Sequence, residues 1–511
     1  MIYDIIIKNG EIIDGSGNEG YRADLALTGG KIALISKDIT ADARQIIDAT
    51  GLTVTPGFID SHSHSDLNFF DSPQQSAKVE QGITTAIGGQ CGMSLYPRRK
   101  AAATGKDIQD KFETFGEFIS GNLSTPQGSN LAVFIGHGQL REAVMGMDKR
   151  QPTAEELEEM KALLREGIKN GALGISFGLI YTPSCYADTR ELTELAKVSA
   201  EMGGLVVAHI RNEADCQLEA VEEFLQIIKT SGARAIFSHH KAAYKQNHGK
   251  VRKSLALISE AIENGADVYC DVYPYVASST ALEARFIPDK YRKGAAELVA
   301  FLQNTAIREE LTALNQKEWG DYLGWVLINE CAGYPQYEGK DLNEIAEIHG
   351  KSIYDTVFDL LTESGGHCDA SYFSMSEQDV ETVMQFPRTM IGTDGGAVEG
   401  LTTYHPRLRG TFPRVLGRYV RERGVVALPE MIRKITSLPA YVYGLSGKGL
   451  IEEGYDADLC IFDAEKIIDR ADFTHCDLRA EGLNYVIIGG EIVAENATAN
   501  GKLNGRIIPR R

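Results

Sequence analysis

The chain has 511 residues, with 52 Lys and Arg against 71 Asp and Glu, so its formal net charge at pH 7 is −19. This length exceeds the roughly 250–300 residues that one hydrophobic core serves, which predicts more than one structural unit. Hydrophobic residues make up 43% of the chain and charged residues 24%, a composition that excludes a disordered or collagen-like protein. The acidic balance argues against partners such as nucleic acid or an anionic membrane.

The N-terminus and the cysteines predict a cytoplasmic protein. The first residues, MIYDIIIKNGEIIDGSG, lack the basic start, the continuous apolar core and the small-residue cleavage site of a signal peptide. No uninterrupted apolar run reaches the roughly 20 residues needed to span a bilayer. The eight cysteines include no CxxC pair, which favours reduced thiols inside a cell.

Both ends of the chain show short alternating runs that are typical of β-strands. Near the N-terminus, Asn9-Gly10 and Gly29-Gly30 each separate two such runs, and the pattern recurs near the C-terminus around Gly489-Gly490. Asn-Gly and Gly-Gly at these places predict hairpin turns. We therefore expect residues 1–53 and 441–511 to form one small β-sandwich domain together.

Residues 54–440 alternate between short apolar runs and amphipathic stretches such as Ala154–Asn170. Eight runs are candidate strands: Val54–Asp60, Thr84–Gly88, Leu131–Gly136, Leu173–Phe177, Leu205–Ala208, Ala235–Ser238, Val268–Val272 and Thr389–Gly392. Eight βα units of this kind predict an α/β protein with a (β/α)8 TIM-like barrel. The long gap before the last strand indicates an inserted subdomain, which we place near residues 288–345.

Potential metal ligands follow five of these strands at their carboxyl ends, where the active site of such a barrel lies. They are His62 and His64 after the first strand, Cys91 after the second, His209 after the fifth, His239 after the sixth and Asp394 after the eighth. Residues two apart on a strand point the same way, so Lys241 should lie beside His239 while His240 points away. Imidazole, thiolate and carboxylate groups together favour Zn²⁺ over a metal that prefers oxygen ligands.

Each of these residue types also has an ordinary structural use. A lone histidine is more often structural than a ligand, and that is our interpretation of His137, His248, His349, His367, His405 and His475. A free cysteine is usually a small buried hydrophobic residue, but the strand-end position and flanking glycines of Cys91 favour ligation. Asp394 could cap a helix; its place among histidines favours a catalytic role, in which it accepts and returns a proton.

Two segments resemble signatures of the amidohydrolase superfamily: Thr55–His64 (TPGFIDSHSH) and Lys448–Asp458 (KGLIEEGYDAD). Within it the chain is similar over essentially its whole length to the D-aminoacylase, or N-acyl-D-amino-acid deacylase, group. The residues that carry this similarity are Cys91, Ala208–Glu213, Ser238–Lys241, Tyr273–Tyr275, His405–Arg407 and Gly410–Gly417. Many superfamily members carry a carboxylated lysine after the fourth strand; residues 174–181 contain no lysine, and Cys91 resembles its substitute in this group.

The resemblance implies zinc-dependent hydrolysis of N-acyl-D-amino acids to a carboxylate and the free D-amino acid. It implies one tightly bound zinc at Cys91, His209 and His239, and a weaker second zinc site at His62 and His64. Asp394 would be both a metal ligand and the residue that carries the proton. The α-carboxylate of the small-molecule substrate would be bound by Lys241, Tyr273 and Arg407, with Tyr181 nearby.

Arg285 bears on the side chain that the substrate carries. By resemblance it stands where members of the group that act on acidic substrates have a side-chain-binding arginine, and a guanidinium can bind a carboxylate through two hydrogen bonds. This favours D-Glu or a similar acidic side chain, although Glu283 nearby could pair with the arginine instead. Two other functions stay open: a cyclic amide hydrolase of dihydroorotase or hydantoinase type, which the missing lysine disfavours, and a non-catalytic scaffold that forms a homo-oligomer.

Overall fold

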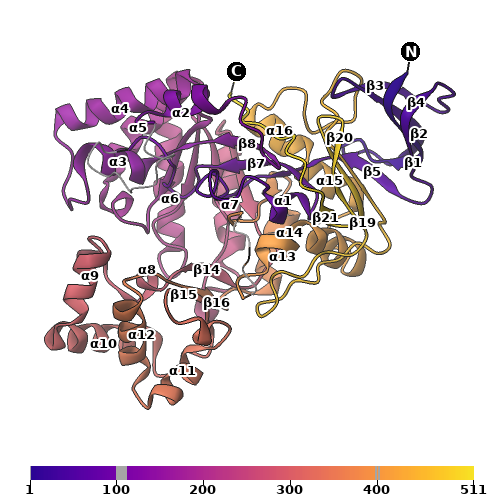
Figure 1. Ribbon diagram of the computed structural model, residues 1–511. Helices are drawn as coiled ribbons and strands as arrows, with labels where there is room; N and C mark the ends of the chain where they lie inside the picture. Colours follow the sequence, from indigo (N-terminus) through magenta and orange to yellow (C-terminus); the bar gives the residue numbers. More distant parts are fainter. Residues whose placement is uncertain (1, 99–111, 398–399, 401–402, 511) are drawn as a thin grey trace.

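The computed structural model describes residues 2–98, 112–397, 400 and 403–510. The protein has mixed α/β structure, and three regions stand apart in Figure 1. One is a strand-rich region that holds the N-terminus, the second is a central set of strands with helices around it, and the third is a lobe that carries helices α8 to α12. Among the described residues, no helix combines the length and the apolar character needed to cross a bilayer.

Strands from both ends of the chain form one nine-stranded sheet. Its order is β21-β20-β19-β18-β5-β1-β2-β3, with β4 also paired to β1. The N-terminal strands are β1 (Tyr3–Ile12), β2 (Tyr21–Thr28), β3 (Lys31–Ser36), β4 (Ala43–Asp48) and β5 (Thr53–Pro56). The C-terminal strands are β18 (Leu459–Phe462), β19 (Leu483–Ile488), β20 (Glu491–Glu495) and β21 (Thr498–Ala499). The two ends join where β18 pairs antiparallel with β5.

Two of the three predicted hairpin turns are confirmed, and one is wrong. Gly29-Gly30 joins β2 to β3, and Gly489-Gly490 joins β19 to β20. Asn9-Gly10 instead lies within the single strand β1, whose register against β2 shifts at this point. Asn9 has φ 62°, and its N–H donates to Asp24 Oδ1 at 2.9 Å. Asn tolerates the left-handed conformation that a β-bulge can require, so the same dipeptide serves a bulge here.

Each of the eight segments predicted as central strands contains a parallel strand. The strands form two sheets, β6-β7-β8 and β17-β13-β12-β11-β10-β9. Their bounds are β6 (Phe58–Asp60), β7 (Ile83–Gly88), β8 (Asn130–Val133), β9 (Ile135–Gly136), β10 (Gly174–Gly178), β11 (Leu205–His209), β12 (Arg234–Phe237), β13 (Val268–Val272) and β17 (Thr389–Ile391). Two predicted strands are divided: Val54–Asp60 becomes β5 and β6, with β5 in the nine-stranded sheet, and Leu131–Gly136 breaks at Phe134 into β8 and β9.

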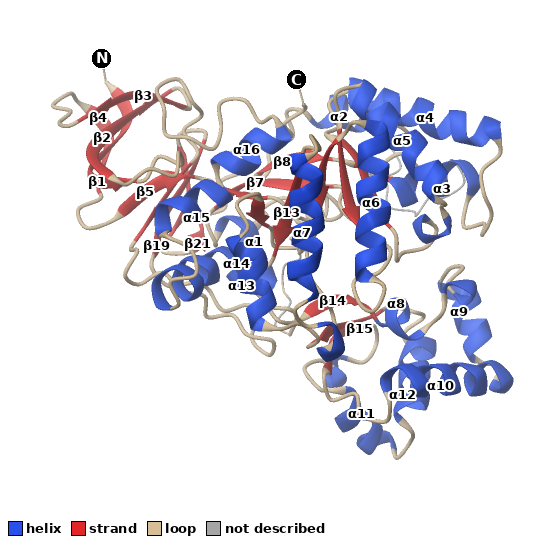
Figure 2. Cartoon of the chain, turned by 180° about the vertical axis from the view of Figure 1, so that it is seen from behind, coloured by secondary structure: helices blue, strands red, loops and turns tan. Residues whose placement is uncertain are grey.

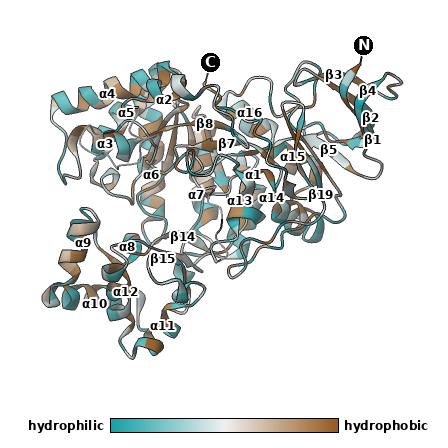
Figure 3. Ribbon diagram, in the orientation of Figure 1, coloured by the Kyte–Doolittle hydropathy of each residue, from teal (hydrophilic) through white to brown (hydrophobic). Residues whose placement is uncertain are grey.

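Amphipathic helices cover the parallel strands. They include α4 (Ala154–Lys169), α5 (Thr189–Glu201), α6 (Gln217–Ser231) and α7 (Lys250–Glu263), and Figure 2 shows α6 and α7 lying across the strands. Helix α4 begins at a capping box formed by Thr153 and Glu156, which satisfies free N–H groups of its first turn. Its Met160, Leu164 and Ile168 are buried, and Figure 3 shows hydrophobic and hydrophilic residues alternating along the helix. Burial of one face therefore fixes α4 against the strands.

The inserted lobe has its own small sheet and its own core. Strands β14 (Ser278–Ala281), β16 (Cys368–Tyr372) and β15 (Val326–Cys331) pair antiparallel in that order. The helices are α8 (Leu282–Phe286), α9 (Ala295–Leu302), α10 (Thr305–Trp319), α11 (Leu342–His349) and α12 (Ile353–Glu363). A separate cluster of buried apolar residues runs from Leu282 to Tyr372. The lobe thus extends beyond residues 288–345 on both sides, because β14 and β16 close its base.

A buried lysine joins the first and last parallel strands. Lys78 lies on the short helix α1 (Ser76–Val79) and is fully buried. Its Nζ donates to Asp60 Oδ2 at 2.9 Å, to Thr393 Oγ1 at 2.8 Å and to the Gly395 carbonyl at 2.8 Å. Asp60 in turn accepts the Thr393 N–H at 2.7 Å. The ammonium and the carboxylate therefore hold the end of β6 against the segment that follows β17.

Replacing Lys78 should destabilise the fold strongly. Lys78→Met leaves the Asp60 carboxylate buried without its cation, and we expect a loss of roughly 3–5 kcal/mol in the free energy of unfolding, measured by urea denaturation. Lys197→Met is the control, because Lys197 pairs with Glu194 at the surface, where such a pair contributes about 0–1 kcal/mol. Equal stability of the two variants would contradict the linking role of Lys78.

Candidate active site

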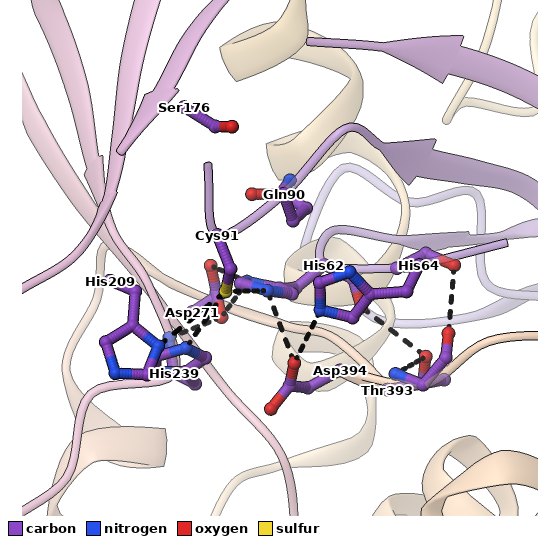
Figure 4. A network of polar contacts seen from close by, with 12 residues as sticks. His62, His64, Gln90, Cys91, Ser176, His209, His239, Asp271, Thr393 and Asp394 are labelled. Carbon is purple, nitrogen blue, oxygen red and sulfur yellow. Dashed lines mark hydrogen bonds and ion pairs between the residues drawn. The ribbon is translucent and has the colours of Figure 1, made fainter. Parts of the chain in front are cut away.

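The six side chains predicted to bind metal meet at the carboxyl ends of the parallel strands (Figure 4). His62 and His64 follow β6, Cys91 follows β7, His209 ends β11, His239 follows β12 and Asp394 follows β17. The ligand atoms of His62, Cys91, His239 and Asp394 all lie within 4.8 Å of one another. Residues distant in sequence thus form one compact group of potential metal ligands.

The Cys91 thiol is at the centre of three imidazole rings. Its Sγ lies 3.3 Å from His62 Nε2, 3.4 Å from His239 Nε2 and 3.7 Å from His209 Nδ1. Burial alone would raise the pKa of Cys91, but the neighbouring His62 and His239 outweigh it and hold this pKa well below that of an ordinary thiol. A thiolate surrounded by imidazole nitrogens is a ligand set that suits zinc.

The Asp394 carboxylate faces the same group from the opposite side. Its Oδ1 lies 3.2 Å from His64 Nε2 and 3.4 Å from His62 Nε2, and its Oδ2 accepts a hydrogen bond of 2.7 Å from Arg407 Nη1. Burial would raise the pKa of Asp394, but the Arg407 guanidinium and the imidazoles hold it well below its usual range. The carboxylate is therefore ionised and held in place.

Three of these residues have an unusual backbone conformation. Cys91, His239 and Asp394 have φ values of 54°, 35° and 50°, in a left-handed region that costs a non-glycine residue about 1–3 kcal/mol. The loop that carries Cys91 also packs tightly, because a Cβ added at Gly178 would lie 1.8 Å from the Cys91 carbonyl oxygen. The surrounding chain thus aims these side chains at one point despite the conformational cost.

Sequence reasoning missed two buried carboxylates behind the histidines. Asp271 Oδ1 accepts a hydrogen bond of 2.7 Å from the backbone N–H of His239, and Asp271 Oδ2 lies 3.3 Å from the ring nitrogen Nδ1 of His62. Glu213 Oε1 lies 3.0 Å from His239 Nδ1 and 2.5 Å from Lys241 Nζ. The sequence contains a signal for each of these carboxylates. Asp271 is a charged residue inside the otherwise apolar strand β13, and Glu213 follows the predicted ligand His209 by four residues.

The residues predicted to bind the α-carboxylate lie around the same site. Lys241 Nζ is 2.7 Å from His239 Nδ1 and 5.5 Å from the ring centre of Tyr273. The Arg407 guanidinium lies 5.3 Å from the same Tyr273 ring. The Tyr181 ring packs at 5.2 Å from that of His209, and its hydroxyl lies 3.2 Å from Thr280 Oγ1. The structure therefore brings all four residues close to the predicted metal ligands.

A cavity of about 500 Å³ opens beside these groups. Its lining includes His64, Cys91, Tyr181, Asp394 and Arg407. Glu283 and Ala284 also line it, whereas the neighbouring Arg285 directs Nη2 to 3.9 Å from Glu213 Oε2 and packs over the Tyr372 ring. The cavity gives a small molecule access to the thiol and the carboxylate.

His240 faces away from the site, as alternation along the strand predicts. Its Nε2 lies 2.7 Å from Ser254 Oγ on α7, and its ring packs against Phe237. His137 belongs to a separate buried group, with Nε2 2.9 Å from Glu191 Oε1. Both histidines therefore have structural partners.

Comparison with known proteins identifies the family. Residues 45–494 match the amidohydrolase family. The chain belongs to this family. It is 36% identical over 514 residues to D-aminoacylase of Alcaligenes xylosoxydans xylosoxydans, a match that covers 99% of this chain and 98% of the relative.

Two solved structures of family members share the fold closely. N-acyl-D-glutamate deacylase of Bordetella bronchiseptica, complexed with zinc and a phosphonate that mimics the tetrahedral intermediate, matches with a TM-score of 0.86 and 34% identity over 100% of both chains. A structure of D-aminoacylase matches with a TM-score of 0.84 and 35% identity over 99% of this chain and 100% of the other. That protein has a binuclear metal centre, in which one metal activates and the second metal attenuates.

The low pKa of Cys91 predicts unusual thiol reactivity. In protein stripped of metal, iodoacetamide that enters the cavity should alkylate Cys91 at pH 7, because the thiolate persists below the ordinary thiol pKa of about 8.5. Cys270 is the internal control, since it is fully buried and burial raises its pKa. Peptide mass spectrometry measures both sites, and added zinc should protect Cys91. Labelling of Cys91 only above about pH 8.5 would contradict the imidazole-stabilised thiolate.

Proposed function

We propose that this amidohydrolase hydrolyses the amide bond of N-acyl-D-amino acids and releases a carboxylate and the free D-amino acid. The observation that carries the proposal is the Cys91 thiol among three imidazoles, facing an ionised Asp394 at the edge of a cavity. The nearly full-length similarity to D-aminoacylase supports the substrate class. The D configuration rests on that similarity.

The residues present fit zinc. In this proposal Cys91, His209 and His239 hold one tightly bound zinc, and His62 and His64 provide a weaker second site. The contacts of the thiol support the tight site, since His239 Nε2 and His209 Nδ1 lie 3.4 Å and 3.7 Å from Cys91 Sγ. When bound, zinc polarises a carbonyl and lowers the pKa of water to about 7. The zinc in the Bordetella deacylase supports the choice of metal.

The chain's own residues supply proton transfer and orientation. Asp394 lies near His62 and His64, and it accepts the proton of the attacking water and delivers it to the leaving amine nitrogen. Arg407 keeps this carboxylate ionised and oriented through the 2.7 Å hydrogen bond. Lys241, Tyr273 and Arg407 bind the substrate α-carboxylate in this proposal, with Tyr181 beside them.

We also propose a finer description of the architecture and surroundings. The parallel strands form one (β/α)8 barrel within residues 54–440, and residues 1–53 and 441–511 form a β-sandwich. A hydrogen bond of 3.2 Å from Ser61 N to Ile391 O, which links the ends of β6 and β17, supports closure of the barrel. All eight cysteines are free, which supports a reducing, cytoplasmic location.

Two substitutions separate metal binding from proton transfer. Cys91→Ala should lose the tightly bound zinc, because it removes the ligand at the centre of the imidazoles. Asp394→Asn should keep the tight zinc and lose about 10²–10⁴-fold in kcat, because the amide cannot accept a proton. Metal analysis by mass spectrometry and amine release from N-acetyl-D-amino acids measure the two effects.

Matched controls are Cys270→Ala and Asp472→Asn, which remove a buried thiol and an exposed carboxylate outside the site. Both should retain zinc and turnover. A fully active Asp394→Asn enzyme would remove Asp394 from the mechanism, and a Cys91→Ala enzyme with its full zinc content would remove Cys91 from the metal site.

Arg285 tests the preference for an acidic side chain. We propose that Arg285 binds the side-chain carboxylate of N-acetyl-D-glutamate, so Arg285→Ala should lower kcat/KM for this substrate by about 10- to 100-fold, the usual effect of losing a charge-assisted hydrogen bond. N-acetyl-D-leucine should be much less affected. Arg308→Ala, which breaks an ion pair with Asp359 in the inserted lobe, is the control. An equal loss on both substrates would contradict binding of the side-chain carboxylate and would indicate that Arg285 acts through Glu213, which lies 3.9 Å from its Nη2.

A further inference from the structure

Glu213 is a buried carboxylate at the candidate active site, and the proposed reaction leaves it without a role. It follows His209 by four residues in the loop after β11, and only 5% of it is exposed. An ionised carboxylate in such a position needs partners that compensate its charge. Its partners are two of the proposed zinc ligands and the lysine proposed to bind substrate.

Each carboxylate oxygen of Glu213 faces one imidazole ring. Oε2 lies 3.5 Å from His209 Nε2, and Oε1 lies 3.0 Å from His239 Nδ1. The other nitrogen of each ring points at the Cys91 thiol, at 3.7 Å for His209 Nδ1 and 3.4 Å for His239 Nε2. Each ring therefore has one nitrogen toward the proposed metal position and one toward Glu213.

This arrangement fixes the tautomers that zinc binding requires. A neutral imidazole carries one N–H, so a ring that gives one nitrogen to a metal carries hydrogen on the other. Both rings would then donate to Glu213, one to each oxygen. In the described part of the chain, His209 Nε2 and Glu213 Oε2 are buried without hydrogen-bond partners although they face each other. A small approach of the ring completes this bond.

Glu213 also determines the position of Lys241. Lys241 Nζ lies 2.5 Å from Glu213 Oε1 and 2.7 Å from His239 Nδ1. Once His239 Nδ1 carries hydrogen, it and the ammonium are both donors, so Lys241 keeps Glu213 as its acceptor and has other N–H groups free for substrate. Arg285 Nη2 lies 3.9 Å from the same carboxylate. Two cations beside one anion leave a positive charge that matches a substrate carboxylate.

We propose that Glu213 is a positioning residue that orients both His209 and His239 for the metal while it holds Lys241 for the substrate carboxylate. The inference rests on the proposed function, because it assigns these histidines to zinc. Carboxylates that accept hydrogen bonds from metal-binding histidines fix ring orientation, and their loss typically lowers metal affinity by about 10- to 100-fold.

Zinc affinity of the Glu213→Gln variant tests the role without any substrate. The amide keeps the size of the side chain but offers one acceptor oxygen, so one of the two rings loses its partner. We expect zinc affinity, measured by chelator competition, to fall about 10- to 100-fold, and the absorption spectrum of the cobalt-substituted protein to change. Asp215→Asn is the matched control, since it removes a carboxylate from the exposed part of the same loop and should leave both measurements unchanged.

Glu213→Asp provides a second test if Glu213→Gln does not fold. It keeps the charge but withdraws the carboxylate by one methylene, and it should also weaken zinc binding. Wild-type zinc affinity and an unchanged cobalt spectrum in a folded Glu213 variant would overturn this inference alone. Failure of the wild-type protein to bind zinc would overturn the proposed function as well.

Discussion

The candidate active site depends on negative charge buried against imidazole rings. The Cys91 thiolate and the Asp394 carboxylate belong to one group whose ligand atoms lie within 4.8 Å of one another, and like charges this close repel strongly where water is excluded. His62 and His239 lie beside the thiolate, and Arg407 stabilises the carboxylate from behind. A divalent cation bound among these groups would compensate the same charge. Affinity for metal is thus built into the arrangement of buried acids and bases.

Holding these groups together requires a rigid frame, because three of the side chains sit on left-handed backbone. The parallel strands supply fixed starting points, and Lys78 binds the end of β6 to the segment after β17 through Asp60 and Thr393. That link lies two residues from His62 and one residue from Asp394 along the chain. Interactions that stabilise the fold and those that position the reactive groups are therefore neighbours, and conformational cost at the site is offset by burial around it.

Local patterns in the sequence predicted most of the strands and the residues that gather at their ends, since both follow from periodicity and from the rule that parallel strands end on one side. Choices that depend on tertiary contacts were out of reach. Asn9-Gly10 suits a turn and a bulge equally well, and pairing with β2 selects the bulge. Spacing and charge marked Glu213 and Asp271 in the sequence, but only the fold shows that both carboxylates contact His239. The direction of Arg285, toward Glu213, depends on how the inserted lobe packs.

Amine release by the zinc-loaded protein is the direct test of N-acyl-D-amino acid hydrolysis. The substrates are paired D and L forms of N-acetyl-glutamate, N-acetyl-leucine and N-acetyl-methionine, with dihydroorotate as a cyclic amide control. We expect selective turnover of the D series and no opening of the cyclic amide. Zinc-containing protein that leaves every linear amide intact, or that opens dihydroorotate instead, would contradict it.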